Sequence, residues 1–334
     1  MTKINSKELA VVVIGRNEGS RLLSCFESLK DYLPRIVYVD SGSIDESIGT
    51  ALQYGITVVT LNSDLPFTAA RARNAGFAKV LEIWKNVRYI QFIDGDCELN
   101  PQWIPNALEN LTKETSLGIV CGRRREKYPS ASLYNQLCDI EWDTPVGSTQ
   151  SCGGDALVKV EAFAKVNGFD SSLIAGEEPE MGYRMIRQGY SIERIHCEMT
   201  LHDANMKSFH QWMKRTIRSG YAYANGYWLH HTEPAPLHQK RNISILFYSL
   251  LVPTAALTII FLKGFPEGAL FFLFIQLSLV TKVFLSSRQR TNSRFHLLCY
   301  SIFVSIGKFC EGFGQLKFLS HLLLNKKGTL IEYK

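Results

Sequence analysis

The chain has 334 residues, of which 46% are hydrophobic, and this composition excludes both a disordered chain and a single small module. The formal net charge of +6 is unevenly spread, because residues 201–334 carry 16 Lys and Arg against 5 Asp and Glu, whereas residues 1–200 are acidic overall. A basic C-terminal part indicates a nucleic acid or an anionic membrane surface as a partner.

Short apolar strands alternate with helical patterns in the first hundred residues. We expect strands at residues 9–14, 35–39, 56–61 and 89–93, and helices at about 22–29, 45–54 and 68–85. This alternation predicts an α/β fold with a mainly parallel, Rossmann-like sheet that is covered by helices on both faces. Sheets of this kind bind ligands at the carboxyl ends of their strands.

Polar side chains cluster at the ends of these expected strands. They are Asn17-Glu18 after the first strand, Asp40 to Asp45 after the second, and Asp94-Gly95-Asp96 after the fourth. Two carboxylates one residue apart can hold a hard divalent cation, which in turn holds phosphate oxygens. An isolated Asp-Gly-Asp string is more often a solvated turn, so the metal site is indicated only together with the other polar residues near it. Arg71 and Arg73 lie on the following helix, where a guanidinium can bind a diphosphate or simply face solvent.

Residues 100–235 show a less regular pattern. They include a glycine pair at 153–154, an acidic turn at 176–180 and an aromatic, basic helix at about 208–230. We expect Arg123-Arg124-Arg125 to form a solvated turn. Pro234 and Pro236 indicate a boundary, which divides the chain into residues 1–235 and 236–334.

Two long apolar stretches follow this boundary. Residues 243–262 contain no charged side chain, and residues 269–287 contain only Lys282. At about 1.5 Å per residue each stretch can cross a hydrocarbon layer about 30 Å thick. A buried hairpin in a soluble protein is the less common alternative. Residues 295–324 are apolar but carry three charged side chains, so we expect a helix that lies in the membrane interface.

Basic side chains flank the two expected spans. Residues 238–241 contain Lys240 and Arg241, and Arg288, Arg290 and Arg294 follow the second span. Positive flanks on both sides place both ends in the cytosol. The N-terminal run lacks a signal-peptide apolar region and cleavage site. We therefore expect a multi-pass protein of the cell membrane with its N-terminal domain on the cytoplasmic side.

The order of the polar motifs resembles that of the family 2 glycosyltransferases of the GT-A fold. The motifs are Val12-Val13-Ile14-Gly15-Arg16-Asn17-Glu18, Val39-Asp40-Ser41-Gly42-Ser43-Ile44-Asp45, Ala72-Arg73-Asn74-Ala75-Gly76, Asp94-Gly95-Asp96, Gly153-Gly154, Asn167-Gly168-Phe169-Asp170 and Gly176-Glu177-Glu178. Each motif is loose, but their order over residues 9–200 is specific. The resemblance implies an inverting transfer of a sugar from a nucleotide-diphosphate sugar to an acceptor.

The resemblance also implies roles for individual residues. Asn17, Glu18, Asp40, Asp45, Arg73 and Asp94 would form the nucleotide-sugar site, with Asp40 at the base, Asp94 at the ribose and Arg73 near the diphosphate. Asp96 would bind Mn²⁺ or Mg²⁺, and His202 is a candidate for a further metal ligand or a structural histidine. Glu178 would be the catalytic base, with Glu177 as the second candidate. Glutamate departs from the family pattern here, because the base is usually the Asp of a Glu-Asp pair.

Elementary chemistry supports these assignments. Glycosyl transfer needs charge neutralisation on the leaving group, which a metal ion and an arginine supply. It also needs a carboxylate that accepts the proton of the acceptor. The sequence therefore predicts a metal-dependent, hexosyltransferase-like enzyme that acts on a lipid-linked or saccharide acceptor in cell-surface polysaccharide or glycoconjugate synthesis.

Three alternatives remain open at this point. A non-catalytic nucleotide-sugar-binding subunit of a polysaccharide assembly complex would tolerate the Glu-for-Asp change at Glu178. A nucleotidyltransferase would require a glycine-rich loop with Lys or Arg after the first strand, and residues 15–19 match this poorly. Nucleic-acid binding is disfavoured, because the basic excess coincides with the apolar stretches.

Overall fold

The computed structural model describes residues 6–325, which form two compact units. The first unit comprises Met1–Tyr128 and Trp142–Ala204, and the second comprises Pro129–Glu141 and Asn205–Lys334. The chain therefore passes between the units three times. The short segment at 129–141 belongs to the second unit, although it interrupts the sequence of the first.

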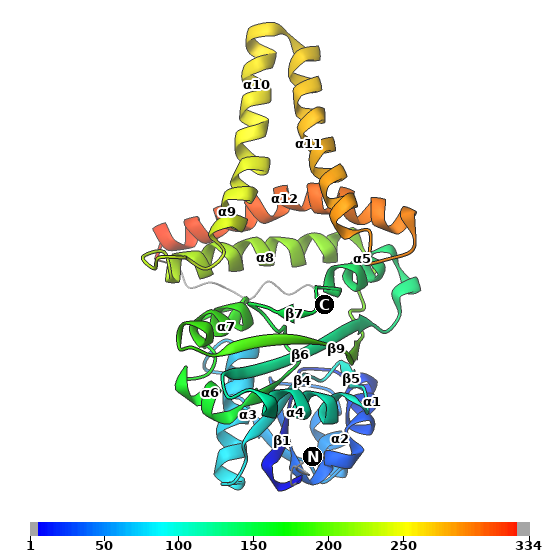
Figure 1. The fold of residues 1–334 in the computed structure, drawn as a ribbon, viewed down its shortest axis with the longest axis vertical. Helices are drawn as coiled ribbons and strands as arrows, with labels where there is room; N and C mark the ends of the chain where they lie inside the picture. Colours follow the sequence, from blue (N-terminus) through cyan, green and yellow to red (C-terminus); the bar gives the residue numbers. More distant parts are fainter. Residues whose placement is uncertain (1–5, 326–334) are drawn as a thin grey trace. The chain divides into compact units, whose positions relative to one another are not determined.

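A nine-stranded sheet forms the centre of the first unit (Figure 1). Its strands are β1 (Leu9–Gly15), β2 (Ile36–Asp40), β3 (Thr57–Thr60), β4 (Tyr89–Asp94), β5 (Cys97–Leu99), β6 (Leu117–Glu126), β7 (Gly147–Ser148), β8 (Ala156–Lys159) and β9 (Ser191–His202). The order is β3-β2-β1-β4-β8-β6-β9-β5, with β7 beside β9. The first four strands are parallel, as are β6 and β9, whereas β5, β7 and β8 pair antiparallel. A mainly parallel sheet is confirmed.

Helices connect and cover these strands. They are α1 (Ser20–Ser28), α2 (Ser47–Gln53), α3 (Ala69–Ile83), α4 (Trp103–Lys113), α6 (Val160–Lys165) and α7 (Glu177–Arg187), with short 3₁₀ turns η1 (Ser6–Glu8) and η2 (Lys30–Arg35). The core is formed by the buried strands β1, β2 and β4 and the apolar faces of these helices. Helix α3 packs very closely on β1, because a side chain at Gly76 would come within 2.3 Å of Val12. The small residues of α3 thus hold Arg73 against the sheet.

Two local expectations were wrong. The acidic segment at 176–180 is not an open turn but the first turn of α7, which begins after Gly176. Gly176 adopts a left-handed backbone with φ of 81°, a conformation that suits glycine. Arg123, Arg124 and Arg125 do not form a solvated turn either, because they continue β6 beside β9.

The second unit is helical. Its elements are η3 (Pro129–Ala131), α5 (Leu133–Trp142), α8 (Phe209–Leu229), α9 (Gln239–Leu246), η4 (Phe247–Leu251), α10 (Val252–Lys263), α11 (Phe265–Ser287) and α12 (Arg294–Leu323). Ser208 caps α8 through a capping box with Gln211. Helices α10 and α11 form an antiparallel hairpin, while α8 and α12 run alongside each other, across the direction of that hairpin (Figure 1).

Three helical stretches are long and apolar enough to cross a membrane: Gln239–Lys263, Phe265–Ser287 and Arg294–Leu323. The first two contain the expected spans at 243–262 and 269–287. Close helix contacts in this unit depend on glycine. A Cβ at Gly268 would lie 2.3 Å from Ile260, and one at Gly314 would lie 2.1 Å from the carbonyl oxygen of Ile217 on α8. Small residues at close helix contacts are typical of helices that pack within membranes.

Candidate active site

The loops that follow β1 and β2 are joined by hydrogen bonds. The Asn17 side chain accepts a hydrogen bond from the backbone of Ile44 at 2.8 Å, and Asp45 accepts one from the backbone of Gly19 at 3.1 Å. Glu18 pairs with Arg21 at 2.7 Å. The predicted residues Asn17, Glu18 and Asp45 therefore lie together at the carboxyl edge of the sheet.

Asp40 ends β2 and is fully buried. One carboxylate oxygen accepts a hydrogen bond from the hydroxyl of Tyr38 at 3.1 Å, and the other accepts bonds from the backbone N–H groups of Gly42 and Ser43 at 2.9 and 2.8 Å. Burial, followed by the charge of Asp40, raises the pKa of Tyr38, so that this hydroxyl stays a donor. Asp40 thus fixes the shape of the loop in which the predicted nucleotide residues lie.

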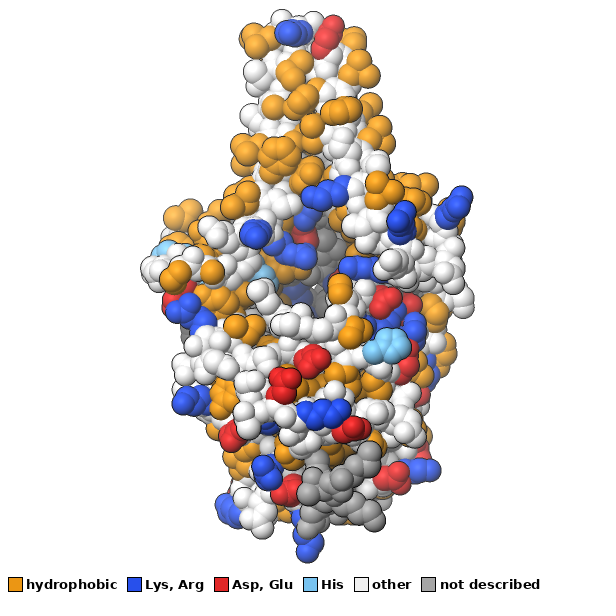
Figure 2. Space-filling view, viewed as in Figure 1, with side chains coloured by type: hydrophobic (Ala, Val, Ile, Leu, Met, Phe, Trp, Pro, Cys, Tyr) orange, Lys and Arg blue, Asp and Glu red, His pale blue; other side chains and the backbone are white. Residues whose placement is uncertain are grey.

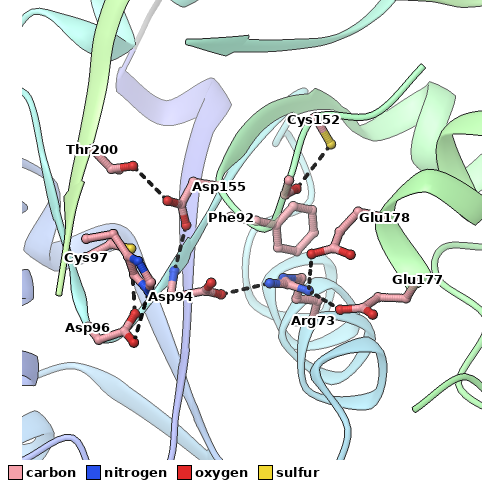
Figure 3. A network of polar contacts seen from close by, with 12 residues as sticks. Arg73, Phe92, Asp94, Asp96, Cys97, Cys152, Asp155, Glu177, Glu178 and Thr200 are labelled. Atoms are coloured by element: carbon pink, nitrogen blue, oxygen red, sulfur yellow. Dashed lines mark hydrogen bonds and ion pairs between the residues drawn. The ribbon is translucent and has the colours of Figure 1, made fainter. Parts of the chain in front are cut away.

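Arg73 is the centre of the next part of the site (Figure 3). Its buried guanidinium donates to Asp94 at 2.7 Å and to Glu177 at 2.9 Å, and it lies 3.9 Å from the carboxylate of Glu178. Burial alone would lower the pKa of Arg73, but these three carboxylates outweigh it and raise the pKa. One arginine therefore connects the end of β4 with the beginning of α7.

The two glutamates of α7 differ in their surroundings. The Glu177 side chain is 6% exposed and its carboxylate is engaged by Arg73 at hydrogen-bond distance, whereas Glu178 is 20% exposed. Burial, together with the neighbouring charge of Glu177, raises the pKa of Glu178 to about 7. A carboxylate with a pKa near the working pH is suited to accept a proton in a reaction.

Asp96 and His202 are brought together by the pairing of β5 with β9. Cys97 lies opposite His202 in this antiparallel ladder, and the Nε2 atom of His202 is 3.3 Å from a carboxylate oxygen of Asp96. Asp96, Cys97 and His202 each place one potential ligand atom within 4.8 Å of the others. Burial, followed by the charge of Arg124, lowers the pKa of His202 to about 4, so its imidazole is neutral at physiological pH.

These residues fit a divalent metal ion. A neutral imidazole nitrogen is a good metal ligand, and the Nε2 atom of His202 faces Asp96. Asp96 offers a carboxylate oxygen 3.3 Å from this Nε2 atom. One oxygen and one nitrogen ligand suit Mn²⁺ better than Mg²⁺, which prefers oxygen ligands alone.

The sequence did not single out several residues that complete the site. Asp155 is fully buried and accepts hydrogen bonds from the backbone of Asp94 at 3.0 Å, from Thr200 at 2.8 Å and from Arg124 at 3.1 Å. The sequence feature that could have identified Asp155 is its position directly after the glycine pair at 153–154. Asp155 therefore sets the position of the Asp-Gly-Asp motif. Arg124 lies in a strand, where it pairs with Asp155 at this site, and not in the predicted solvated turn.

The glycine pair is part of the same structure. A side chain at Gly154 would lie 2.4 Å from the guanidinium of Arg73 and 2.8 Å from the carboxylate of Asp94, so only glycine fits here. By contrast, Arg71 lies away from the site, because it donates to the carbonyl groups of Leu65 and Pro66, both at 2.7 Å. Of the two arginines predicted as diphosphate ligands, only Arg73 reaches the carboxylates.

Comparison with known proteins agrees with this geometry. Residues 10–150 match the model of glycosyl transferase family 2, and residues 138–211 match a model described as the N-terminal domain of galactosyltransferase. The mannosyltransferase PcManGT from Pyrobaculum calidifontis, solved with GDP-Man and Mn²⁺, has a similar fold. Its TM-score is 0.58 at 16% identity, and the match covers 89% of this chain and 86% of that one.

Two curated relatives are similar in sequence. A putative polypeptide N-acetylgalactosaminyltransferase 13 of Drosophila melanogaster is 24% identical over 58% of this chain, and the match spans 41% of that relative's length. The O-antigen chain rhamnosyltransferase RfbN of Salmonella typhimurium is 23% identical over 66% of this chain and 74% of the relative. Residues 10–150 therefore resemble the family 2 glycosyltransferases in sequence, and the sheet of this unit has the GT-A fold.

Proposed function

We propose that this protein is a metal-dependent, inverting glycosyltransferase that moves a sugar from a nucleotide-diphosphate sugar to a lipid-linked acceptor. The observation that carries the proposal is the network in which Arg73 joins Asp94 to Glu177 and Glu178. A cationic group that binds diphosphate and a carboxylate of raised pKa thereby share one site. The metal complex of PcManGT and the name of RfbN agree with a sugar-nucleotide donor and a surface-polysaccharide role.

The residues divide the chemistry between them. Glu178 accepts the proton of the acceptor hydroxyl while its oxygen attacks the anomeric carbon, and the bond from that carbon to the diphosphate oxygen breaks. The leaving nucleoside diphosphate keeps the bonding electron pair, and Arg73 stabilises its charge. Asp96 and His202 would hold Mn²⁺ or Mg²⁺. When bound, such an ion neutralises further charge on the leaving group.

Asn17, Glu18, Asp40, Asp45 and Asp94 would form the pocket for the nucleotide. Their joined loops supply backbone and carboxylate groups at the edge of the sheet where α/β folds bind ligands. Direct attack assisted by one base, without a covalent intermediate, inverts the anomeric carbon, as in inverting hydrolysis.

We propose further that the second unit anchors the enzyme to the cell membrane. Gln239–Lys263 and Phe265–Ser287 would cross the bilayer as a hairpin, because both are long and apolar (Figure 2). Lys240 and Arg241 before the hairpin, and Arg288, Arg290 and Arg294 after it, would place both of its ends on the cytoplasmic side.

Helix α12 would lie along the membrane surface. Its inner face packs on α8, which carries Lys214, Arg215 and Arg218 and is too polar to enter hydrocarbon. Its outer face is an exposed apolar stripe at helical spacing, formed by Phe295, Leu298, Ile302, Ile306, Phe309, Phe313, Leu316, Leu319 and Leu323. A helix with one apolar and one polar face at this level is an interfacial helix.

The proposed function is tested by sugar release from UDP- and GDP-sugars, measured with the purified full chain with and without Mn²⁺. We expect Mn²⁺-dependent hydrolysis by the wild type and its loss in Asp96→Ala, with unchanged melting temperature. Glu109→Ala removes a carboxylate from the exposed face of α4 and is the matched control. Wild-type hydrolysis by Asp96→Ala would rule out the metal role. Donor binding without hydrolysis or transfer would favour the non-catalytic subunit.

A further inference from the structure

Charged and hydroxyl side chains gather at the foot of the hairpin in the second unit. Arg241 is the third residue of the helical stretch Gln239–Lys263, and Arg290 lies three residues after the end of Phe265–Ser287. Figure 2 shows basic side chains below the apolar surface of the hairpin. In the proposed topology this level coincides with the lipid head groups, where anionic groups are found.

Arg241 contacts helices α8 and α12 at once. Its guanidinium donates to the hydroxyl of Tyr223 at 3.0 Å, lies over the ring of this tyrosine at 4.7 Å, and is 3.7 Å from a carboxylate oxygen of Glu311. Lys308 shares Glu311 with it at 2.9 Å. The side chain of Arg241 nevertheless stays 51% exposed. An arginine that is held on one side and open on the other can still donate to a ligand.

Two more arginines act at the same place. Arg215 forms a bidentate pair with Glu141 at 2.8 and 2.9 Å, and Arg290 lies 3.5 Å from the hydroxyl of Tyr300. Burial would raise the pKa of Glu141, but Arg215, Arg241 and Arg290 outweigh it and lower the pKa. Arg215 contacts Glu141 at the end of α5, and the charges of Arg241 and Arg290, which come from separate elements, also act on this carboxylate.

Positive charge exceeds negative charge in this group by two. The six charged side chains are Arg215, Arg241, Arg290, Lys308, Glu141 and Glu311. A phosphate monoester carries close to two negative charges at neutral pH, and a lipid diphosphate whose terminal phosphate is esterified to a sugar also carries two, one on each phosphate. A phosphodiester of a bulk membrane lipid carries one. The excess therefore matches a lipid with a monoester phosphate or a sugar-linked diphosphate better than an ordinary phospholipid.

We propose that Arg241, Arg290 and Arg215, with the hydroxyl groups of Tyr223 and Tyr300, form a binding site for the phosphate or diphosphate of a lipid whose chain lies along the hairpin. This inference rests on the proposed function, because such a lipid would be the carrier of the acceptor. Guanidinium groups and hydroxyl donors are the groups that recognise phosphate by both charge and geometry.

The experiment measures binding of farnesyl phosphate to the full chain in detergent micelles, without any sugar donor. Arg241→Gln and Arg290→Gln remove one charge each, and we expect each to weaken binding about tenfold or more, the usual effect of losing a charge-assisted hydrogen bond. Lys263→Gln is the matched control, because Lys263 ends α10 at the other end of the hairpin. It should bind as the wild type does.

Competition identifies the source of the phosphate. Farnesyl diphosphate should compete with farnesyl phosphate, whereas phosphatidylglycerol micelles and inorganic phosphate should compete at least about tenfold less well. Unchanged affinity in Arg290→Gln, whose only short contact described above is with Tyr300, would overturn the site even if Arg241→Gln misfolds. Equal competition by phosphatidylglycerol or by inorganic phosphate would overturn the assignment of a lipid phosphate or diphosphate as the ligand. Hydrolysis of nucleotide sugars by the wild type is measured separately, so failure of the proposed function is distinguishable from failure of this site.

Discussion

Glu178→Gln separates the proposed catalytic role of this residue from its effect on stability. Glutamine has nearly the shape of protonated glutamate but cannot accept a proton. We therefore expect sugar transfer to fall by about 10²- to 10⁴-fold, as when a general base is removed. In the wild type, transfer should rise with pH and reach half its maximum near pH 7, because the pKa of Glu178 is raised to about 7.

The same substitution should stabilise the protein in alkaline solution. The pKa of Glu178 rises from an ordinary 4.5 to about 7 on folding, so between these values the folded protein keeps a proton that the unfolded chain releases. Stability therefore falls as pH rises through this window, and the full loss at pH 8 is about 3 kcal/mol. Glutamine does not titrate, so its folded form does not lose this stability. Relative to the wild type, Glu178→Gln should raise the free energy of unfolding by about 3 kcal/mol at pH 8 and by under about 1 kcal/mol at pH 5.

The assay is thermal unfolding of the full chain at pH 5 and pH 8. For a unit of this size, about 3 kcal/mol corresponds to an increase of about 6 to 12 °C in melting temperature. Glu177→Gln is the comparison, and it should lower the melting temperature at both pH values, because Arg73 loses its 2.9 Å partner. An equal gap between wild type and Glu178→Gln at both pH values would refute the reasoning.

Three further outcomes are expected. His202→Ala should weaken Mn²⁺ binding in calorimetric titration by about tenfold or more, since one ligand is lost, and an unchanged affinity would exclude His202 from the metal site. Gly154→Ala should abolish binding of nucleotide sugars, because its methyl group would lie 2.4 Å from the guanidinium of Arg73, and normal binding would show that the glycine turn can move aside. Gly314→Val should lower the melting temperature, because its Cβ would lie 2.1 Å from a backbone oxygen of α8; an unchanged value would show that the two helices can separate.

The sequence predicted best where each strand is short, apolar and followed by polar residues. Strands β1 to β4 and helix α3 lie where their patterns indicated, and Arg73 of α3 contacts Asp94, Glu177 and Glu178. Parallel strands of this type are buried on both faces and therefore show a strong local pattern. The carboxyl ends of these strands lie at one edge of the sheet. Local patterns alone therefore predict that motifs far apart in the sequence lie near one another.

Prediction failed where side chains serve both structure and site. Arg124 and Asp155 form a nearly buried pair at 2.8 Å, with side chains 17% and 0% exposed, although the sequence predicted a solvated turn for Arg124 and did not single out Asp155. Strand β6 shifts register against β9 at several points, so its alternation is broken. Arg123 pairs with Asp143, Arg124 with Asp155 and Arg125 with Glu198, and such non-local pairing leaves no local signal in the sequence.

The three crossings between the units constrain how the protein can be made. During synthesis, α5 leaves the ribosome long before α8 and α12, to whose unit it belongs, so its apolar face must wait for them. A truncation after residue 235 would leave α5 and α8 in the product but delete the helix on which α8 packs. A fragment limited to the first unit would instead end near Ala204, with residues 129–141 replaced by a short linker, and would contain none of the three long apolar helical stretches.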